Sequence, residues 1–356
     1  MKNLVEVRNL KKYFYRSPNL FSYFSTARTQ SNIVPAVDDV SFDIAPGEVV
    51  GLVGESGCGK TTLGRTILRL MDKTDGEVYI NGEDIFSLSP KMLWQKRGEM
   101  QIVFQNPSAA LNSQIRVRSI IEEALKIHTT LGREARRRRI YQLLEMVKLA
   151  KSKADRYPYE LSGGEKRRVG FARILATNPR FIVADEPTSS LDVSIQLQIV
   201  NLMQELQREA GLTYLFISHD LRMVTYLSKT VIVMYLGKIV EKSLTKKMSL
   251  DKMLHPYSQQ LLASSYAVSA KKQWRKSLPR HAKTSFFVDF DKVEDVFFTG
   301  CRFCPRCYLY GLELNQPEIC RVESPLLRQV SEDHWVACHF IKEKQELDQK
   351  CEIEIT

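Results

Sequence analysis

The chain has 356 residues, of which 44% are hydrophobic and 26% charged, with a formal net charge of +11. This length predicts one large domain with an extension, and the composition allows a sizeable core. No uninterrupted apolar run approaches the roughly 18–20 residues that cross a bilayer. The start, MKNLVEVRNL, has no signal-peptide pattern, so we expect the chain to stay in the cytosol.

The positive charge raises nucleic acid as a possible partner. No RNA-binding fingerprint, helix-turn-helix or aromatic-basic platform supports that interpretation, and we expect no nucleic acid. Much of the excess charge lies in short runs such as REARRRR at 133–139. Such a run is typical of a solvated helix face, with docking to anionic lipid headgroups or a membrane partner as the alternative.

The first predicted elements are strands at 4–7 and 40–44, where apolar and polar residues alternate. Residues 16–35, rich in Ser, Thr, Asn and aromatics, predict an irregular insertion. EVVGLVG at 48–54 predicts a buried strand that enters a glycine-rich turn and then a helix. Further strands are predicted at 77–80, 101–104, 181–184, 213–217 and 230–235.

A helical block is predicted at 117–150, and the regular pattern weakens after Glu241. The apolar positions of the helical block are Ile120, Ile121, Leu125, Leu143, Leu144 and Val147. The remaining alternation of strands and helices predicts an α/β core with a mainly parallel sheet.

The turn after the buried strand fits the phosphate-loop pattern G-x-x-x-x-G-K-[ST]. Glycines let backbone N–H groups surround phosphate oxygens, and the helix that follows directs its positive end at the same anion. Lys60 supplies a charge to the β- and γ-phosphates, and Thr61 offers its hydroxyl to Mg²⁺. The predicted ATP-binding residues here are Gly54, Glu55, Ser56, Gly57, Cys58, Gly59, Lys60, Thr61 and Thr62.

A second half of the site is predicted at FIVADEP, residues 181–187, where a hydrophobic strand ends in two carboxylates. Asp185 suits Mg²⁺, because a hard cation takes oxygen ligands. Glu186 is the predicted general base that polarises the attacking water.

Between these halves lies LSGGEKRR at 161–168, which resembles the signature motif of ABC ATPases. Gln105 in VFQNP, Asp192 in SLD and His219 in ISHD are similar to the Q-loop, D-loop and switch histidine of that family. The resemblance runs from about residue 4 to 242. It implies an ABC-type P-loop core: a RecA-like parallel sheet, an antiparallel β subdomain and a helical subdomain inserted at roughly 106–160.

The resemblance also implies roles for these residues. Gln105 would contact Mg²⁺ and the attacking water, and His219 would hold the γ-phosphate and assist Glu186. Phe14 would stack on adenine, with Tyr13 as second choice. The signature residues would bind ATP held by an opposite subunit; they are Ser162, Gly163, Gly164 and Glu165.

Two residues depart from the signature, since Glu165 and Arg167 stand where the family usually has Gln. The carboxylate of Glu165 would oppose closure on an anion by like-charge repulsion. Hydrolysis is still expected, because the serine and the glycines are intact.

Narrower features resemble the ATPases of oligopeptide/dipeptide permeases: GLVGESGCGKTTLGR, DEPTSSLDVSIQLQIVNLMQELQ, HPYSQQLL at 255–262, and a C-terminal Cys-rich tail. This implies an ATP-hydrolysing subunit at the cytoplasmic face of the membrane, peripheral to two permease subunits and served indirectly by an extracytoplasmic solute-binding protein. It favours a heterodimer with a second ABC ATPase over a homodimer. The expected cargo is di- or oligopeptides, with nickel chelates, glutathione or another small solute as alternatives.

Other functional classes stay open at this point. A soluble ABC protein acting on ribosomes or DNA would usually carry two nucleotide domains or a long coiled coil, and this chain shows neither. An exporter ATPase or a regulatory ABC subunit is a further alternative. The domain boundary is placed between residues 250 and 251, with the tail at 251–356.

Six of the seven cysteines follow residue 300, which in a cytosolic chain favours metal binding over disulfides. The subfamily resemblance implies a [4Fe–4S] site within 301–338, held by Cys301, Cys307, Cys320 and Cys338. Soft thiolates suit such a cluster. Cys304 is a possible substitute ligand, and tetrahedral zinc or unligated reduced thiols are the alternatives.

Overall fold

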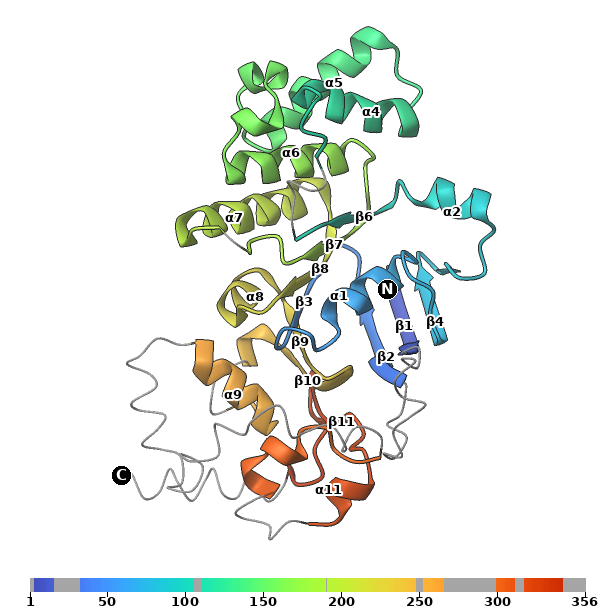
Figure 1. Cartoon of the computed structure of the whole chain (residues 1–356), viewed down its shortest axis with the longest axis vertical. Coiled ribbons are helices and arrows are strands. Elements are labelled where there is room, and N and C mark those ends of the chain that lie inside the picture. Colours follow the sequence, from blue (N-terminus) through green and yellow to red (C-terminus); the bar gives the residue numbers. More distant parts are fainter. Residues whose placement is uncertain are drawn as a thin grey trace, which may run out of the picture.

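The computed structural model describes residues 3–15, 33–105, 111–189, 191–247, 252–265, 299–310 and 317–341. Two sheets form its centre, one with the strand order β2-β1-β4-β5 and one with the order β11-β12-β10-β9-β3-β8-β7-β6. The helices α4 and α5 lie at one end of the long axis and the tail lies at the other (Figure 1). The α/β class predicted from the sequence is confirmed.

The larger sheet has a parallel centre. It contains β3 (Val49–Val53), β6 (Met100–Val103), β7 (Phe181–Asp185), β8 (Thr213–Ser218) and β9 (Thr230–Tyr235). Of these, β3, β7, β8 and β9 are buried along their whole length. Strands covered on both faces are apolar throughout, which is why they read in the sequence as continuous hydrophobic runs.

The two faces of this sheet pack into two separate apolar cores. In β3, Val49 and Val53 belong to the core that includes the helical block, whereas Val50 and Leu52 belong to the core under the smaller sheet. This division follows from the two-residue period of a strand. The sheet is therefore fixed between two packed apolar layers, and this also fixes the loops that follow its strands.

The smaller sheet is antiparallel and consists of β1 (Val5–Tyr15), β2 (Ile33–Ile44), β4 (Asp75–Ile80) and β5 (Glu83–Asp84). The predicted strands at 4–7 and 40–44 were too short. Register shifts interrupt the pairing of β1, and Asn9 has a positive φ of 45°. Such a bulge breaks the alternation by which a strand is recognised in a sequence.

The predicted insertion at 16–35 ends earlier than expected, because its last three residues belong to β2. The rest of that insertion, residues 16–32, lies outside the described residues.

The helical block contains two α-helices, α4 (Val117–His128) and α5 (Arg133–Met146), followed by 3₁₀ turns. The chain leaves helical geometry at Thr129 and re-enters it after Gly132. All six apolar positions predicted for this block are buried. The remaining α-helices of the core are α1 (Lys60–Ile67), α2 (Pro90–Lys96), α6 (Gly163–Leu175), α7 (Val193–Ala210) and α8 (Leu221–Leu227).

The tail adds strands to the core sheet. After β9, the strand β10 (Lys238–Leu244) pairs antiparallel with it, and β12 (His334–Val336) and β11 (Arg328–Ser331) follow at the sheet edge. The expectation that regular structure weakens after Glu241 is therefore wrong for these strands. The helices α9 (Pro256–Ser265) and α11 (Ile319–Val322) complete the tail.

Across the described ranges, none of the helices combines the length and the apolar character that crossing a membrane requires. The domain boundary expected at 250/251 falls in a segment outside the described residues.

Candidate functional site

The phosphate loop connects the buried strand β3 to the N-terminus of α1, as the motif requires. Gly59 has φ of 106°, and a Cβ at this position would lie 2.0 Å from the carbonyl oxygen of Ala36. Only glycine fits there, because L-residues disfavour this φ and the backbone of a neighbouring segment fills the space. Lys60 is buried, and its Nζ donates to the carbonyl oxygens of Gly54 at 2.8 Å and Glu55 at 2.7 Å. The carbonyl oxygens of the phosphate loop thus hold the ammonium group of Lys60, the first residue of α1.

The predicted magnesium ligands of the two halves meet. Thr61 Oγ1, in the first turn of α1, donates to Asp185 Oδ1 at 2.8 Å. Asp185 ends β7 and is 2% exposed, and burial raises the pKa of its carboxyl group. Two hard oxygen donors therefore face each other beside the phosphate loop, which is the donor set that Mg²⁺ takes.

The three predicted catalytic residues also lie together. Gln105 Nε2 donates to Glu186 Oε2 at 2.8 Å, and His219 Nδ1 lies 3.3 Å from Glu186 Oε1. Glu186 has a positive φ of 47°. Strained backbone of this kind persists where surrounding structure holds it, and its N–H donates to Ile217 O at 2.9 Å.

The signature residues begin α6, as predicted. Ser162 caps the helix by accepting from the N–H of Glu165, and Glu165 returns a bond by accepting from the N–H of Ser162 at 2.9 Å. A reciprocal pair of this kind satisfies backbone donors at a helix start. The other carboxylate oxygen of Glu165 lies 2.8 Å from Lys153 Nζ. The substitution of Glu for Gln is thus accompanied by a cation that offsets its charge.

Arg167, the second departure, bridges two loops of the site. Its Nη2 donates to the carbonyl oxygen of Gln105 at 3.4 Å and also to that of Ser189. Its Nε and Nη1 are buried and have no hydrogen-bond partner in the described part of the chain. Burial lowers the pKa of this guanidinium. Arg167 therefore ties the Q-loop backbone to the loop that follows Glu186.

The D-loop and the adenine side are less enclosed. Asp192 is exposed at the N-cap of α7, and Ser190 lies outside the described residues. Phe14, near the end of β1, is 37% exposed, with Lys12 Nζ 5.1 Å from its ring centroid. The hydroxyl of Tyr13, the second choice for adenine stacking, donates to Asp38 at 2.6 Å.

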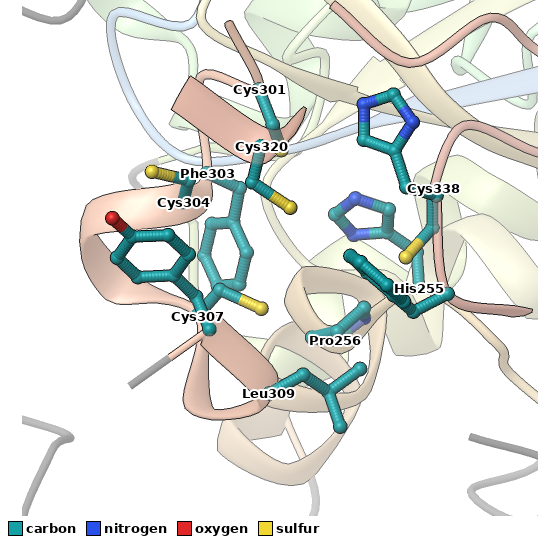
Figure 2. A pocket seen from close by; sticks show the side chains of 12 residues that line it. His255, Pro256, Cys301, Phe303, Cys304, Cys307, Leu309, Cys320 and Cys338 are labelled. Carbon is teal, nitrogen blue, oxygen red and sulfur yellow. The ribbon is translucent and has the colours of Figure 1, made fainter. Parts of the chain in front are cut away.

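Five of the six tail cysteines line one pocket. It is lined by Cys301, Cys304, Cys307, Cys320 and Cys338, together with apolar and aromatic side chains such as Phe303 and Leu309. The sulfur atoms of Cys307, Cys320 and Cys338 point toward the space between them, while that of Cys304 points away (Figure 2). Among the described residues, no group of three or more His, Cys, Asp or Glu side chains is arranged to hold a metal ion.

Burial raises the pKa of Cys301 to about 12 and that of Cys320 to about 11, and it also raises the pKa of Cys307. Thiols with raised pKa in apolar surroundings are poor nucleophiles. These buried thiols are therefore not expected to act as reactive nucleophiles.

Sequence reasoning missed three tail residues that touch the nucleotide site. Arg306 pairs with Glu55 of the phosphate loop, Tyr257 Oη accepts from the N–H of Glu55, and Arg302 pairs with Asp38. Tyr257 lies in the run HPYSQQLL, and both arginines lie in GCRFCPRC at 300–307, part of the Cys-rich tail; both features resemble the permease ATPases. The sequence offered the charges and the phenol, but nothing in it named their partners.

Comparison with known proteins agrees with this geometry. The sequence profile described as ABC transporter matches residues 37–189. The oligopeptide transport ATP-binding protein AppF of Bacillus subtilis is 43% identical over 95% of this chain and 98% of its own length. The OppF protein of the same organism, with the same description, is 49% identical over 74% of this chain and 82% of its own.

A solved ATP-binding cassette, described as a dimer in a post-hydrolysis state bound to ADP and Pi, has a TM-score of 0.59 and 29% identity. The match covers 68% of this chain and 98% of the cassette.

Proposed function

This chain belongs to the ABC transporter family of ATP-binding subunits, and we propose that it hydrolyses ATP to drive the import of oligopeptides. The observation that carries the proposal is the meeting of Thr61 with Asp185 beside Glu186, which contacts Gln105 and His219. These contacts support a phosphate site, a metal site and a general base in one place. The peptide cargo is supported by the descriptions of the relatives, which are oligopeptide transport proteins.

Each residue would then contribute one part of the hydrolysis. Lys60, buried in the phosphate loop, would exchange its two carbonyl partners for the β- and γ-phosphates. Glu186 would accept a proton from the attacking water, and His219 would orient that water and the γ-phosphate. Mg²⁺, held by Thr61, Asp185 and Gln105, would supply positive charge against the phosphates.

A second subunit would complete the site. Ser162 and the two glycines after it stand at the N-terminus of α6, the positive end of a helix dipole, which suits an anion. We propose that this surface binds the γ-phosphate of ATP held by a second ABC ATPase, in a heterodimer rather than a homodimer. The matched solved cassette is itself described as a dimer.

The other proposed partners are two permease subunits, fed by an extracytoplasmic solute-binding protein. The chain would lie peripherally at the cytoplasmic face of the membrane. The segment from Gln105 through Ile120, of which residues 106–110 lie outside the described residues, is the proposed docking groove for a permease helix, because in the sequence it joins Gln105 to the helical block.

The test of catalysis uses the reconstituted transporter. Glu186→Gln is expected to retain ATP binding and to slow turnover by about 10²–10⁴-fold, because the general base is lost. Lys60→Ala is expected to fail at ATP binding, because the phosphates lose their compensating charge. The exposed Glu209→Gln on α7 is the matched control. Near-normal hydrolysis by Glu186→Gln would assign the base to another residue.

The test of cargo is uptake of a labelled oligopeptide into proteoliposomes that contain the permeases and the binding protein. Uptake is expected to require ATP and to stop with Glu186→Gln. ATP-driven uptake of nickel chelate or glutathione but not of peptide would reject the peptide assignment.

For the tail we propose a [4Fe–4S] cluster held by Cys301, Cys307, Cys320 and Cys338, with zinc as the alternative. The thiols line a pocket, and three of the sulfurs point across it (Figure 2). A cluster takes one thiolate at each of four separate iron corners, whereas zinc needs its ligands to converge on one point.

Anaerobic purification followed by iron, sulfide and zinc analysis tests this proposal. Iron and labile sulfide are expected in equal amounts, and Cys320→Ser is expected to lose them while ATP binding is retained. Stoichiometric zinc without sulfide would eliminate the cluster.

A further inference from the structure

The tail reaches the phosphate loop through one ion pair. Arg306 Nη1 lies 2.9 Å from Glu55 Oε2, and Arg306 Nη2 lies 3.0 Å from Glu55 Oε1. Two parallel N–H···O bonds fix the orientation of both side chains as well as their separation. A residue 251 positions further along the chain therefore determines where the side chain of Glu55 lies.

Glu55 is held from three directions. Its N–H donates to Tyr257 Oη at 2.8 Å, its carbonyl oxygen accepts from Lys60 Nζ at 2.7 Å, and its carboxylate is held by Arg306. Two of these three contacts come from the tail. The phosphate loop is consequently held at Glu55 by two residues of the tail.

Arg306 is itself well supported. Its guanidinium lies 5.8 Å from the ring centroids of both Tyr235 and Phe303, and its side chain is 15% exposed. Phe303 packs edge-on against Tyr235, with ring centroids 5.2 Å apart. An arginine that rests on aromatic rings loses little side-chain freedom when it forms a bidentate pair.

The charge of this pair matters for the ligand. Glu55 places a carboxylate in a loop that has to receive a polyanion, and like charges at short range oppose binding. Its side chain is 38% exposed, so solvent screens it only in part. Arg306 supplies the opposite charge directly on that carboxylate.

We propose that Arg306 is a positioning residue of the nucleotide site, which anchors Glu55 to the tail and cancels its charge so that the phosphate loop can accept a triphosphate. This inference rests on the proposed function, because it requires ATP at the phosphate loop.

The test is a double-mutant cycle on the full chain. Binding of a fluorescent ATP analogue is measured for Arg306→Gln, Glu55→Gln and the double variant. Arg306→Gln is expected to weaken binding by about five- to fiftyfold, in the range of couplings between neighbouring sites. The double variant is expected to recover most of that loss, because the uncompensated carboxylate is gone. Arg328→Gln, an exposed tail arginine on β11, is the matched control.

Two further variants separate charge from folding. Arg306→Met keeps the contact with the aromatic rings but loses the charge, and it takes the place of Arg306→Gln if that variant does not fold. Arg306→Lys keeps the charge and is expected to bind more tightly than Arg306→Gln. In turnover assays the KM for ATP should rise while kcat stays within about twofold, as expected when binding rather than the chemical step is affected.

An ATP affinity of Arg306→Gln or Arg306→Met equal to that of the wild type overturns the proposal. So does a loss of affinity that Glu55→Gln does not reverse, since this would indicate a purely structural role. Failure of the proposed function looks different, because the wild-type chain would then not bind ATP or Lys60→Ala would leave binding unchanged.

Discussion

Glu241 is the residue whose replacement should most directly detach the tail from the core. It lies in β10 and is fully buried. Its Oε1 accepts from the N–H of Leu254 at 2.8 Å and lies 2.7 Å from His334 Nε2 of β12, while its Oε2 accepts from the N–H of His255 at 3.0 Å. One carboxylate thus joins the core sheet, the start of α9 and the last tail strand.

The expected cost of Glu241→Leu follows from these contacts. Leucine has a similar size but offers no acceptor, so two buried backbone N–H groups lose the oxygen to which they donate. Each such loss costs about 1–3 kcal/mol, which gives about 2–6 kcal/mol before the loss at His334 is counted. This is a large effect for a single substitution, and it should fall on the tail first.

The assay follows urea unfolding through the fluorescence of Trp335, which lies in β12 beside Glu241's partner His334. The chain has three tryptophans, so Trp94→Phe and Trp274→Phe leave Trp335 as the reporter. In this background Glu241→Leu is expected to unfold at a lower urea concentration, whereas the exposed Glu209→Leu on α7 is expected to unfold like the parent. A midpoint equal to that of the parent would refute the reasoning.

Three other changes give further predictions. Gly59→Ala is expected to weaken ATP binding by about tenfold or more, since strain of about 1–3 kcal/mol is forced on the phosphate loop. Gly132→Ala, whose Cβ would meet no atom within 4 Å, is its control in the same binding assay. Lys153→Met is expected to lower ATP turnover by about two- to fivefold, the range of a partly exposed ion pair, and adding Glu165→Gln to that variant should restore the turnover. If it does not, the charge of Glu165 is not what Lys153 offsets. Arg167→Gln is expected to raise the free energy of unfolding by about 1 kcal/mol, because a buried guanidinium with two unsatisfied nitrogens is removed; a lower stability in urea unfolding would show that its bonds to Gln105 and Ser189 outweigh that penalty.

Much of the fold could be predicted because it is encoded in short segments. The buried strands β3 and β7 are continuous apolar runs, and the phosphate loop and the start of α6 are defined by a few adjacent residues. The length of β1 could not be predicted, since its bulges remove the alternation on which the prediction depends. The strands β11 and β12 were missed because β12 joins the sheet by pairing with β10, almost 100 positions earlier in the chain.

The residues of the site also divide into those that a sequence motif identifies and those that it does not. Gln105, Glu186 and His219 were found because each belongs to a motif, and the structure brings all three into contact. Lys153 was missed because the sequence shows a substitution at Glu165 but not the cation that accompanies it. The charge of Glu165 follows from one residue of the sequence, whereas the ion pair that offsets it depends on a second residue whose position only the structure gives.

Two arginines of the tail also form ion pairs whose partners cannot be read from the sequence. Arg302 and Arg306 stand on either side of Cys304 and pair with Asp38 and Glu55, two carboxylates of the core. Asp38 accepts the hydroxyl of Tyr13, and Glu55 lies in the phosphate loop, so each pair borders a different part of the nucleotide site. Without the tail Glu55 would lose Arg306, and Asp38 would keep Lys238 but lose Arg302. Negative charge would then be less well compensated in the region where a polyanion has to bind, and it would oppose that binding. If our proposal for Arg306 holds, the ATP affinity of this cassette depends on the tail as well as on the motifs that identify it, because the tail supplies the cation that faces Glu55.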